Sequence, residues 1–262
     1  MRIIALLLTA FTVLVSVIAQ GAEAEKAAAD KGAWRLKSPG YTNEIIDLPK
    51  ECKEADASMD LKALLYSPKE KQEGKVPLVV LLHGAGGTKQ KSIEAFRGNR
   101  DVRWVYEKQN QKFKARYLVP HAWSHWNPKA LDIAVDHLLE KHDDLDKDRV
   151  YCIGYSLGGL GTWNWARHSH QRLAAIILVG CKTNMDDAEK MKKLPIWAIA
   201  GTADYRGGGM PDQVKKKFVD ELGSKKVKIT KIEGAKHGPS AAMAWKTEGL
   251  LEWLFSHSLK DR

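Results

Sequence analysis

Short apolar runs rich in Val, Ile and Leu alternate with segments of helical period along most of this chain. The expected strands are 78–82, 115–119, 149–153, 173–179, 195–200 and 226–232. The expected helices are 102–113, 128–141, 157–167, 186–193, 211–222 and 240–257. Strands of a parallel sheet are buried on both faces and therefore read as unbroken apolar runs. The alternation predicts an α/β fold with a doubly wound, mainly parallel sheet that helices cover on both faces.

Two segments ahead of this alternation, 41–46 and 59–66, favour an antiparallel leading hairpin. The rest of the order matters for function, because ligands of such sheets bind at the carboxyl ends of the strands. Every candidate catalytic residue below falls just after an expected strand.

The first 24 residues have the order of a secretory signal peptide. Met1-Arg2 is followed by an apolar run to Ile18 and by the small-residue site Ala22-Glu23-Ala24. A membrane anchor is the alternative, although the run is at the short limit for a bilayer core of about 30 Å. Residues 25–37 then form a flexible leader, and 38–262 a single catalytic domain. We expect a secreted or periplasmic protein with no stable membrane insertion after cleavage.

Charge and cysteine content exclude several classes. The formal net charge is +10, but the lysines are scattered, with small runs only at 215–217 and 225–226. Such runs are typical of solvated faces, so no nucleic-acid partner is expected. Attachment of the basic surface to an acidic cell-wall polymer remains open. Cys52, Cys152 and Cys181 allow at most one internal disulfide, and the last two are as readily small apolar fillers of strands.

The run Gly154-Tyr155-Ser156-Leu157-Gly158 lies between an expected strand and an expected helix. A G-x-S-x-G sequence in this context forms a sharp turn that holds the serine clear of the sheet, with its hydroxyl exposed as a nucleophile. A serine cap in a glycine-rich turn is the alternative. The context favours Ser156 as the nucleophile.

A serine hydroxyl needs a base to remove its proton. On this arrangement the chain order is serine, acid, histidine. His168 and His170 fall at the far end of the nucleophile's own helix, and His257 among tail residues, whereas His237 directly follows the last expected strand. We therefore predict His237 as the base, with a surface loop histidine as the alternative.

The base needs a carboxylate to fix its tautomer. Asp204 follows the strand before the one that precedes His237. Its competitors are Asp186 and Asp187, which follow an earlier strand, and Asp212, which suits the start of a helix. Asp204 is the predicted acid.

Acyl transfer also needs amide donors for the developing oxyanion. We expect one from Leu157, next after the nucleophile, and one from Ala85 in the loop His83-Gly84-Ala85-Gly86-Gly87. His83 precedes the nucleophile in sequence and is expected to order this loop through hydrogen bonds.

Two further features are ambiguous. His121 and His125 lack a carboxylate or cysteine at ligand spacing, so no metal site is predicted, and the mechanism needs no cofactor. Trp126 and Trp163, with Trp123 nearby, border the expected site and are candidates for substrate binding. Core packing is the alternative for each of them.

The sequence resembles the α/β-hydrolases, in the esterase and "predicted peptidase" branch related to dienelactone hydrolases, feruloyl esterases and polyhydroxybutyrate depolymerases. The resemblance spans 77–255 and is carried by 81–87, Val119-Pro120 with Trp126, 146–151 and above all 154–163. It implies a Ser-Asp-His hydrolase of the α/β-hydrolase fold. The segment between Gly180 and Pro195 leaves little room for a lid domain.

These expectations converge on an exported serine hydrolase that cleaves carboxylic esters, acting on a small-molecule or polymer-linked ester. A serine peptidase with the same triad is the nearest alternative. A non-catalytic binding protein on the same scaffold is another, although it predicts a broken triad, and every part is present here.

Overall fold

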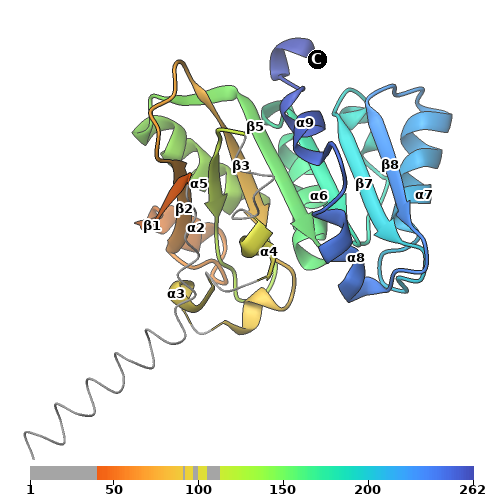
Figure 1. Ribbon diagram of the computed structural model, residues 1–262, viewed down its shortest axis with the longest axis horizontal. Coiled ribbons are helices and arrows are strands. Elements are labelled where there is room, and N and C mark those ends of the chain that lie inside the picture. Colours follow the sequence, from red (N-terminus) through yellow and green to blue (C-terminus); the bar gives the residue numbers. More distant parts are fainter. Residues whose placement is uncertain (1–39, 91, 97–99, 105–112) are drawn as a thin grey trace, which may run out of the picture. The chain divides into compact units, whose positions relative to one another are not determined.

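The alternating pattern folds into one eight-stranded sheet with the strand order β1-β2-β4-β3-β5-β6-β7-β8 (Figure 1). The computed structural model describes residues 40–90, 92–96, 100–104 and 113–262. The strands are β1 Tyr41–Asp47, β2 Lys62–Pro68, β3 Val76–Leu82, β4 Arg116–Val119, β5 Leu145–Tyr155, β6 Ala175–Val179, β7 Ile196–Gly201 and β8 Val227–Ile232. From β4 to β8 neighbouring strands are parallel, whereas β1 pairs antiparallel with β2 and β2 with β4. The α/β class, the mainly parallel sheet and the leading antiparallel pair are therefore confirmed.

Helices cover both faces of the sheet (Figure 1). One face carries α2 Lys50–Ala55, α5 Pro128–Lys141, α6 Leu157–Ser169 and α7 Met210–Val214, whose apolar side chains share one core. The other face carries α3 Ile93–Phe96, α4 Arg100–Arg103, α8 His237–Ala244 and α9 Leu250–Phe255, which share a second core. The strands separate the two cores, because alternate side chains of each strand point to opposite faces.

Several helices differ from the expected ones. The closing helix expected over 240–257 is two helices, because Gly249 adopts a left-handed φ of 72° ahead of α9, and the first of them already begins at His237. The helix expected over 211–222 is α7 followed by a π-helical turn, Lys215–Glu221. Helix α2 was not expected, and 186–193 contains only the 3-10 turn Ala188–Met191. Of the helix expected over 102–113, residues 105–112 lie outside the described residues.

Little chain is inserted between β6 and β7 at the carboxyl edge of the sheet. The segment between β6 and β7 holds only the short 3-10 turn, which agrees with an α/β-hydrolase core that has no separate lid domain there. Within the ranges that the structure describes, no helix combines the length and the apolar character needed to cross a membrane.

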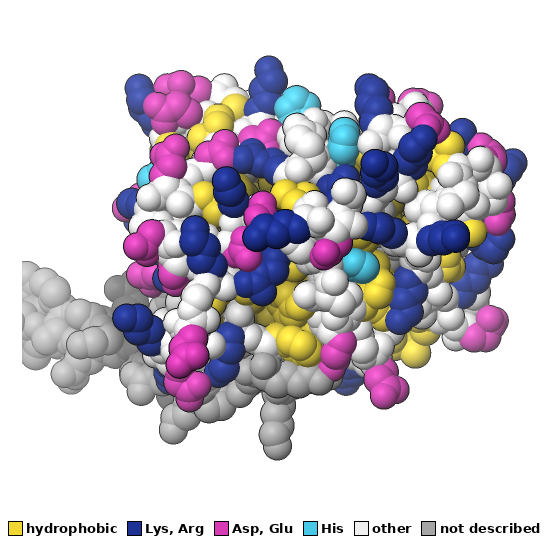
Figure 2. Space-filling view, turned by 90° about the horizontal axis from the view of Figure 1, so that it is seen from above, with side chains coloured by type: hydrophobic (Ala, Val, Ile, Leu, Met, Phe, Trp, Pro, Cys, Tyr) yellow, Lys and Arg dark blue, Asp and Glu magenta, His cyan; other side chains and the backbone are white. Residues whose placement is uncertain are grey.

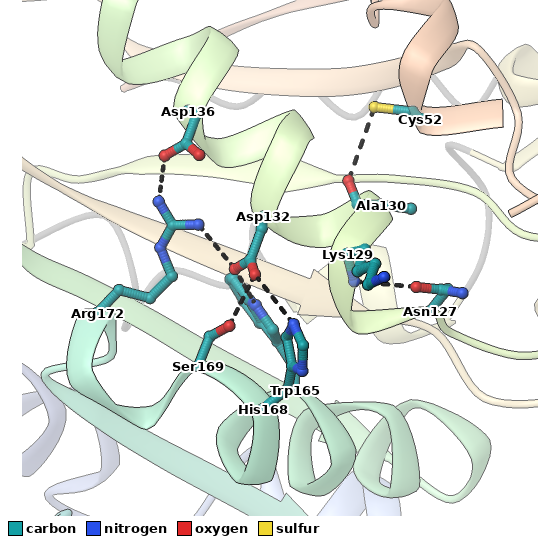
Figure 3. A network of polar contacts seen from close by, with 10 residues as sticks. All are labelled: Cys52, Asn127, Lys129, Ala130, Asp132, Asp136, Trp165, His168, Ser169 and Arg172. Atoms are coloured by element: carbon teal, nitrogen blue, oxygen red, sulfur yellow. Dashed lines mark hydrogen bonds and ion pairs between the residues drawn. The ribbon is translucent and has the colours of Figure 1, made fainter. Parts of the chain in front are cut away.

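A polar network fixes α5 against α6 (Figure 3). The carboxylate of Asp132 on α5 accepts hydrogen bonds from Trp165 Nε1 at 2.8 Å, Ser169 Oγ at 2.7 Å and Arg172 Nη1 at 2.7 Å. The guanidinium of Arg172 also pairs with Asp136 one turn further along α5. Because α6 begins at the residue after Ser156, this network helps to hold the nucleophile's helix on the sheet.

All three cysteines are free and buried. Burial raises the pKa of the Cys52 thiol to about 11, with Glu51 as a second cause, and the pKa of Cys152 to about 12. Burial, and then the charge of Asp204, raises the pKa of Cys181 to about 12. They act as small apolar fillers, as the sequence allowed.

Candidate active site

Ser156 forms the tight turn that joins β5 to α6. Its φ of 56° and ψ of −114° make it the one non-glycine residue with positive φ in the described part of the chain. The turn is held by the Ser156 amide, which donates to Val179 O at 2.9 Å, and by Leu160 N, which donates to Ser156 O at 2.9 Å. A strained strand-to-helix turn of this kind exposes the serine hydroxyl at the carboxyl edge of the sheet.

Glycines let the first turn of α6 lie directly against the sheet. A Cβ on Gly158 would lie 1.9 Å from Leu82 O, and one on Gly154 would lie 2.3 Å from Gly158 O. No side chain fits such a space. Gly158 therefore brings the turn at Ser156 next to the loop that follows β3.

His237 is the first residue of α8, shortly after β8. Its Nε2 lies 2.9 Å from Ser156 Oγ, and its Nδ1 lies 2.8 Å from Asp204 Oδ2. A carboxylate accepts hydrogen bonds, so Nδ1 carries the proton and donates to Asp204. Nε2 is then free to accept the hydroxyl proton of Ser156. The structure thus brings together the three side chains expected from the sequence.

Asp204 lies in the loop after β7 and is only 4% exposed. Besides His237, its carboxylate accepts hydrogen bonds at Oδ1 from the amides of Arg206 at 2.8 Å and Gly207 at 3.1 Å. The loop backbone therefore fixes the carboxylate with one oxygen facing the imidazole.

The competing aspartates are engaged elsewhere. Asp187 pairs with Arg167 and Lys190, and Asp212 pairs with Lys231 at 2.6 Å in the first turn of α7. Asp186 accepts a hydrogen bond from Asn184 Nδ2. These contacts hold all three aspartates to partners other than His237.

Two side chains that the sequence did not single out hold His237. Tyr155 Oη donates to the carbonyl of His237 at 3.0 Å, and its ring lies 5.0 Å from the imidazole, centroid to centroid. Ser240 Oγ donates to the same carbonyl at 2.8 Å. Tyr155 lies inside the G-x-S-x-G run, so its place next to the nucleophile was the sequence signal that could have marked it as a site residue. Nothing in the pattern around Ser240 marked it.

The predicted oxyanion donors lie on the two segments that Gly158 brings together. Leu157 is the first residue of α6, where an amide has no acceptor within the helix. Ala85 is exposed in the loop after β3, and its carbonyl accepts from Thr88 Oγ1 at 2.8 Å, which fixes the turn.

His83 anchors this loop from beneath. It is fully buried, its Nδ1 lies 2.9 Å from Gly84 O, and its Nε2 accepts from Ala122 N at 3.2 Å. The neutral form with the proton on Nδ1 satisfies both contacts. Burial, with a further contribution from His121, lowers the pKa of His83 to about 4. The expectation that His83 orders the loop therefore agrees with these contacts.

Trp126 and Trp163, the two candidates for substrate binding, are both buried in the structure. Trp126 is 4% exposed and donates from Nε1 to His83 O at 3.2 Å. Trp163 is fully buried and donates to Asn184 O at 2.9 Å. Both indoles pack in the core, and Trp126 supports the oxyanion loop. Trp123 is the exposed member of the three, at 44%.

The two histidines that were considered as metal ligands, His121 and His125, contact protein atoms instead. His121 is buried, with Nε2 donating to Gly87 O at 3.1 Å and Nδ1 3.5 Å from Asp60 Oδ2. His125 contacts Ser124 Oγ at 2.9 Å. Among the residues described, no group of three or more His, Cys, Asp or Glu side chains is arranged to hold a metal ion.

A hollow of about 220 Å³ opens beside the acid loop. It is lined by 181–183, 205–210 and Gln213. Its wall at Cys181 packs against Gly159 in the first turn of α6, where an added Cβ would lie 2.8 Å from Cys181 Cβ. Tyr205, which is 83% exposed, stands at its rim. The hollow therefore lies between the nucleophile's helix and the loop that carries Asp204.

Comparison with solved structures finds the same fold in several hydrolases. A thermostable esterase superposes with a TM-score of 0.69 at 24% identity, over 85% of this chain and 64% of its own, so this chain spans less than two thirds of it. A putative dienelactone hydrolase from Klebsiella pneumoniae subsp. pneumoniae MGH 78578 gives 0.57 at 16% identity, over 82% and 98%. An acylaminoacyl peptidase gives 0.56 at 16%, over 84% and 42%. These likenesses show the shared fold.

The comparison with curated proteins found no match to this chain. The sequence model of the dienelactone hydrolase family matches residues 61–242, more than half of the chain and all three residues of the hydrogen-bonded chain Ser156-His237-Asp204. The protein therefore belongs to the dienelactone hydrolase family.

Proposed function

We propose that this protein hydrolyses carboxylic esters by a two-step acyl transfer through Ser156. The observation that carries the proposal is the continuous hydrogen-bonded chain from Ser156 Oγ through His237 to Asp204. His237 Nε2 takes the hydroxyl proton as Oγ attacks the ester carbonyl. The amides of Leu157 and Ala85 stabilise the oxyanion of the tetrahedral intermediate.

The intermediate then collapses to an acyl-enzyme, and His237 gives its proton to the departing alcohol. A water molecule attacks the acyl carbonyl while His237 takes a proton from it. The second tetrahedral intermediate collapses, Ser156 regains its proton, and the acid is released. Asp204 stabilises the imidazolium in both steps but is not itself protonated. The hollow beside the acid loop would receive one of the substrate's substituents.

Replacing Ser156 by Ala tests the mechanism directly. We expect kcat for a short p-nitrophenyl ester to fall by about 10⁴-fold or more, with the unfolding transition retained. A fluorophosphonate probe should label the wild-type protein at Ser156 and leave Ser156→Ala unlabelled. Turnover by the variant near the wild-type rate would refute the mechanism, and an unlabelled wild type would favour the non-catalytic binding protein.

The same triad can cleave amides, and two structural neighbours are acylaminoacyl peptidases. We infer ester hydrolysis as the main activity because the matching family is named for hydrolysis of a lactone, which is a cyclic ester. Matched p-nitrophenyl esters and p-nitroanilides with the same acyl group distinguish an esterase from a peptidase. An esterase should show a much higher kcat/KM for the ester.

We also propose that the protein is exported, on the pattern of residues 1–24. Sequencing the amino terminus of the mature protein tests this. Cleavage after the Ala22-Glu23-Ala24 segment supports export, and a mature chain that keeps residues 1–24 contradicts it.

A further inference from the structure

The edge of the sheet opposite Ser156, at the amino ends of the strands, is rich in cations. Basic residues precede several strands: Lys75 and Lys226 lie directly before β3 and β8, and Lys193 lies three residues before β7. Figure 2 looks onto this edge and shows Lys and Arg side chains spread over its middle, whereas most Asp and Glu lie toward its margins. The catalytic side chains lie at the other edge, so this charge does not belong to the site above.

A hollow of about 400 Å³ opens on this edge where three distant segments meet. Its lining comes from the end of α6, from the turn before β7, and from the carboxyl-terminal turn: His170, Gln171, Glu189, Lys190, Lys192, Lys193, Leu259 and Arg262. Such a volume accommodates several phosphate-sized groups or a short stretch of polymer.

One cation in this hollow is held in place by the backbone. Arg262 Nη1 donates to the carbonyls of His170 and Leu173, each at 2.7 Å. These contacts orient the guanidinium without neutralising it, because both acceptors are uncharged. Burial lowers the pKa of Arg262, and no carboxylate in the described part of the chain forms an ion pair with its guanidinium. Its charge is therefore partly desolvated and uncompensated, the condition in which an anion gains most.

His170 shows the same excess of positive charge. Its Nδ1 is buried with no hydrogen-bond partner. Burial lowers the pKa of His170, and the two charged groups that add to this effect, Arg262 and Lys190, are both cations. A bound anion would supply Nδ1 with a charged neighbour and offset those cations.

Too few carboxylates line the hollow to neutralise its basic side chains. Among the lining side chains Glu189 is the one carboxylate, and it pairs with Lys192 at 2.7 Å. Lys190 pairs with Asp187, which Arg167 shares. Within the described residues, Lys193 and the Arg262 guanidinium remain as cations that form no ion pair with a carboxylate.

We propose that this hollow is a second, non-catalytic site that binds an anionic group of phosphate or carboxylate chemistry. Arg262 forms its fixed donor, and Lys190 and Lys193 supply adjustable charge from the opposite wall. The site does not depend on the proposed ester hydrolysis, since no catalytic residue lines it. The ligand is a free small anion or one charged group of an acidic polymer.

Calorimetric titration of the full chain at low ionic strength tests the site with two probes, inorganic pyrophosphate and polygalacturonate. We expect saturable binding that weakens with added salt. The double variant Lys190→Gln/Lys193→Gln should weaken it by about tenfold, because two nearby charges are lost. Arg262→Gln, as a second variant, should weaken it at least as much.

The matched control is Lys53→Gln/Lys129→Gln, which removes two exposed charges on α2 and α5 away from the hollow. It should change the affinity less than about twofold. Tight binding of pyrophosphate supports a small anion as the ligand, and much tighter binding of the polymer supports the polymer. Binding of neither probe, or an equal loss in the control, overturns the proposal. Ester turnover should be unchanged in all of these variants.

Discussion

Ser156 has a backbone conformation that a residue with a Cβ rarely adopts, at a cost of about 1–3 kcal/mol. The surrounding bonds sustain it: the Ser156 amide remains paired with β6, and the serine carbonyl already accepts the first hydrogen bond of α6. The strain places Oγ above the strand ends, 2.9 Å from His237. At the scale of single residues, the hydrogen bonds that fix the reacting groups explain the site as much as the reacting groups themselves.

Tyr155 is a positioning residue for His237. Tyr155→Phe removes the hydroxyl that donates to the His237 carbonyl but keeps the ring against the imidazole. Because Ser240 donates to the same carbonyl, we expect a moderate fall in kcat, about threefold to tenfold, with KM little changed. Steady-state kinetics and the free energy of unfolding should be measured together. A loss of stability with kcat intact would mean that Tyr155 serves packing alone.

His83 should remain neutral in the folded protein down to about pH 4, because burial is the main cause of its lowered pKa. The unfolded chain binds the proton near pH 6.5, so folding is penalised as the pH falls through that window. The folded state should lose about 2 kcal/mol from this group between pH 7 and pH 5. Imidazole NMR shifts against pH check the titration, and a His83 midpoint near 6.5 would contradict it.

The sequence predicted that Ser156, Asp204 and His237 would lie together because each follows an apolar strand, and strand ends are the most regular signal in this class of fold. It did not predict the burial of Trp126 and Trp163, for a different reason. Position along the chain puts a side chain near the site, but the direction in which an indole points depends on packing that no local pattern encodes. Close approach of Gly161 to Trp126, for example, is visible only in three dimensions.

The position of α6 against the sheet depends on the absence of a side chain at Gly158. Gly158→Ala places a Cβ 1.9 Å from Leu82 O, and a backbone atom cannot give way as a flexible side chain would. We expect a loss of more than about 3 kcal/mol, or failure to fold, since both α6 and β3 would have to shift. Chemical denaturation measures the change.

Gly209→Ala is the matched control, because a Cβ there meets nothing within 4 Å and φ is −81°. It should change stability by less than about 1 kcal/mol. Equal effects of the two substitutions would show that the contact of Gly158 with Leu82 does not limit the position of α6.

Most element bounds could be predicted, and the failures share a cause. Helix α5 begins at Pro128 as expected, where the Asn127 side chain accepts from Lys129 N, and both the cap and the proline are signals present in the sequence. The break at Gly249 lies in a segment whose apolar residues continue with helical period on both sides, so periodicity alone joins α8 to α9. The π-helical turn at 215–221 leaves no pattern either, because its residues also suit an ordinary helix.

At the scale of the whole molecule, one sheet joins two cores. The core under α5 and α6 and the core under α8 and α9 share no side chains, yet both rest on the same central strands. In β5, for instance, Cys152 faces one core and Tyr151 and Ile153 face the other. The packing on one face therefore cannot be lost without disturbing the strands that support the other core.

This coupling predicts a single unfolding transition. Leu138→Ala on α5 and Leu254→Ala on α9 each truncate a buried leucine in a different core, and each should cost about 2–5 kcal/mol. If the sheet couples the cores, both variants lower one common midpoint. Tryptophans report on each core, with Trp163 and Trp165 in the first and Trp197 and Trp245 in the second. Fluorescence and far-ultraviolet circular dichroism should therefore give coincident curves for both variants. Two separate steps, with Leu254→Ala shifting only one of them, would mean that the α9 face unfolds on its own.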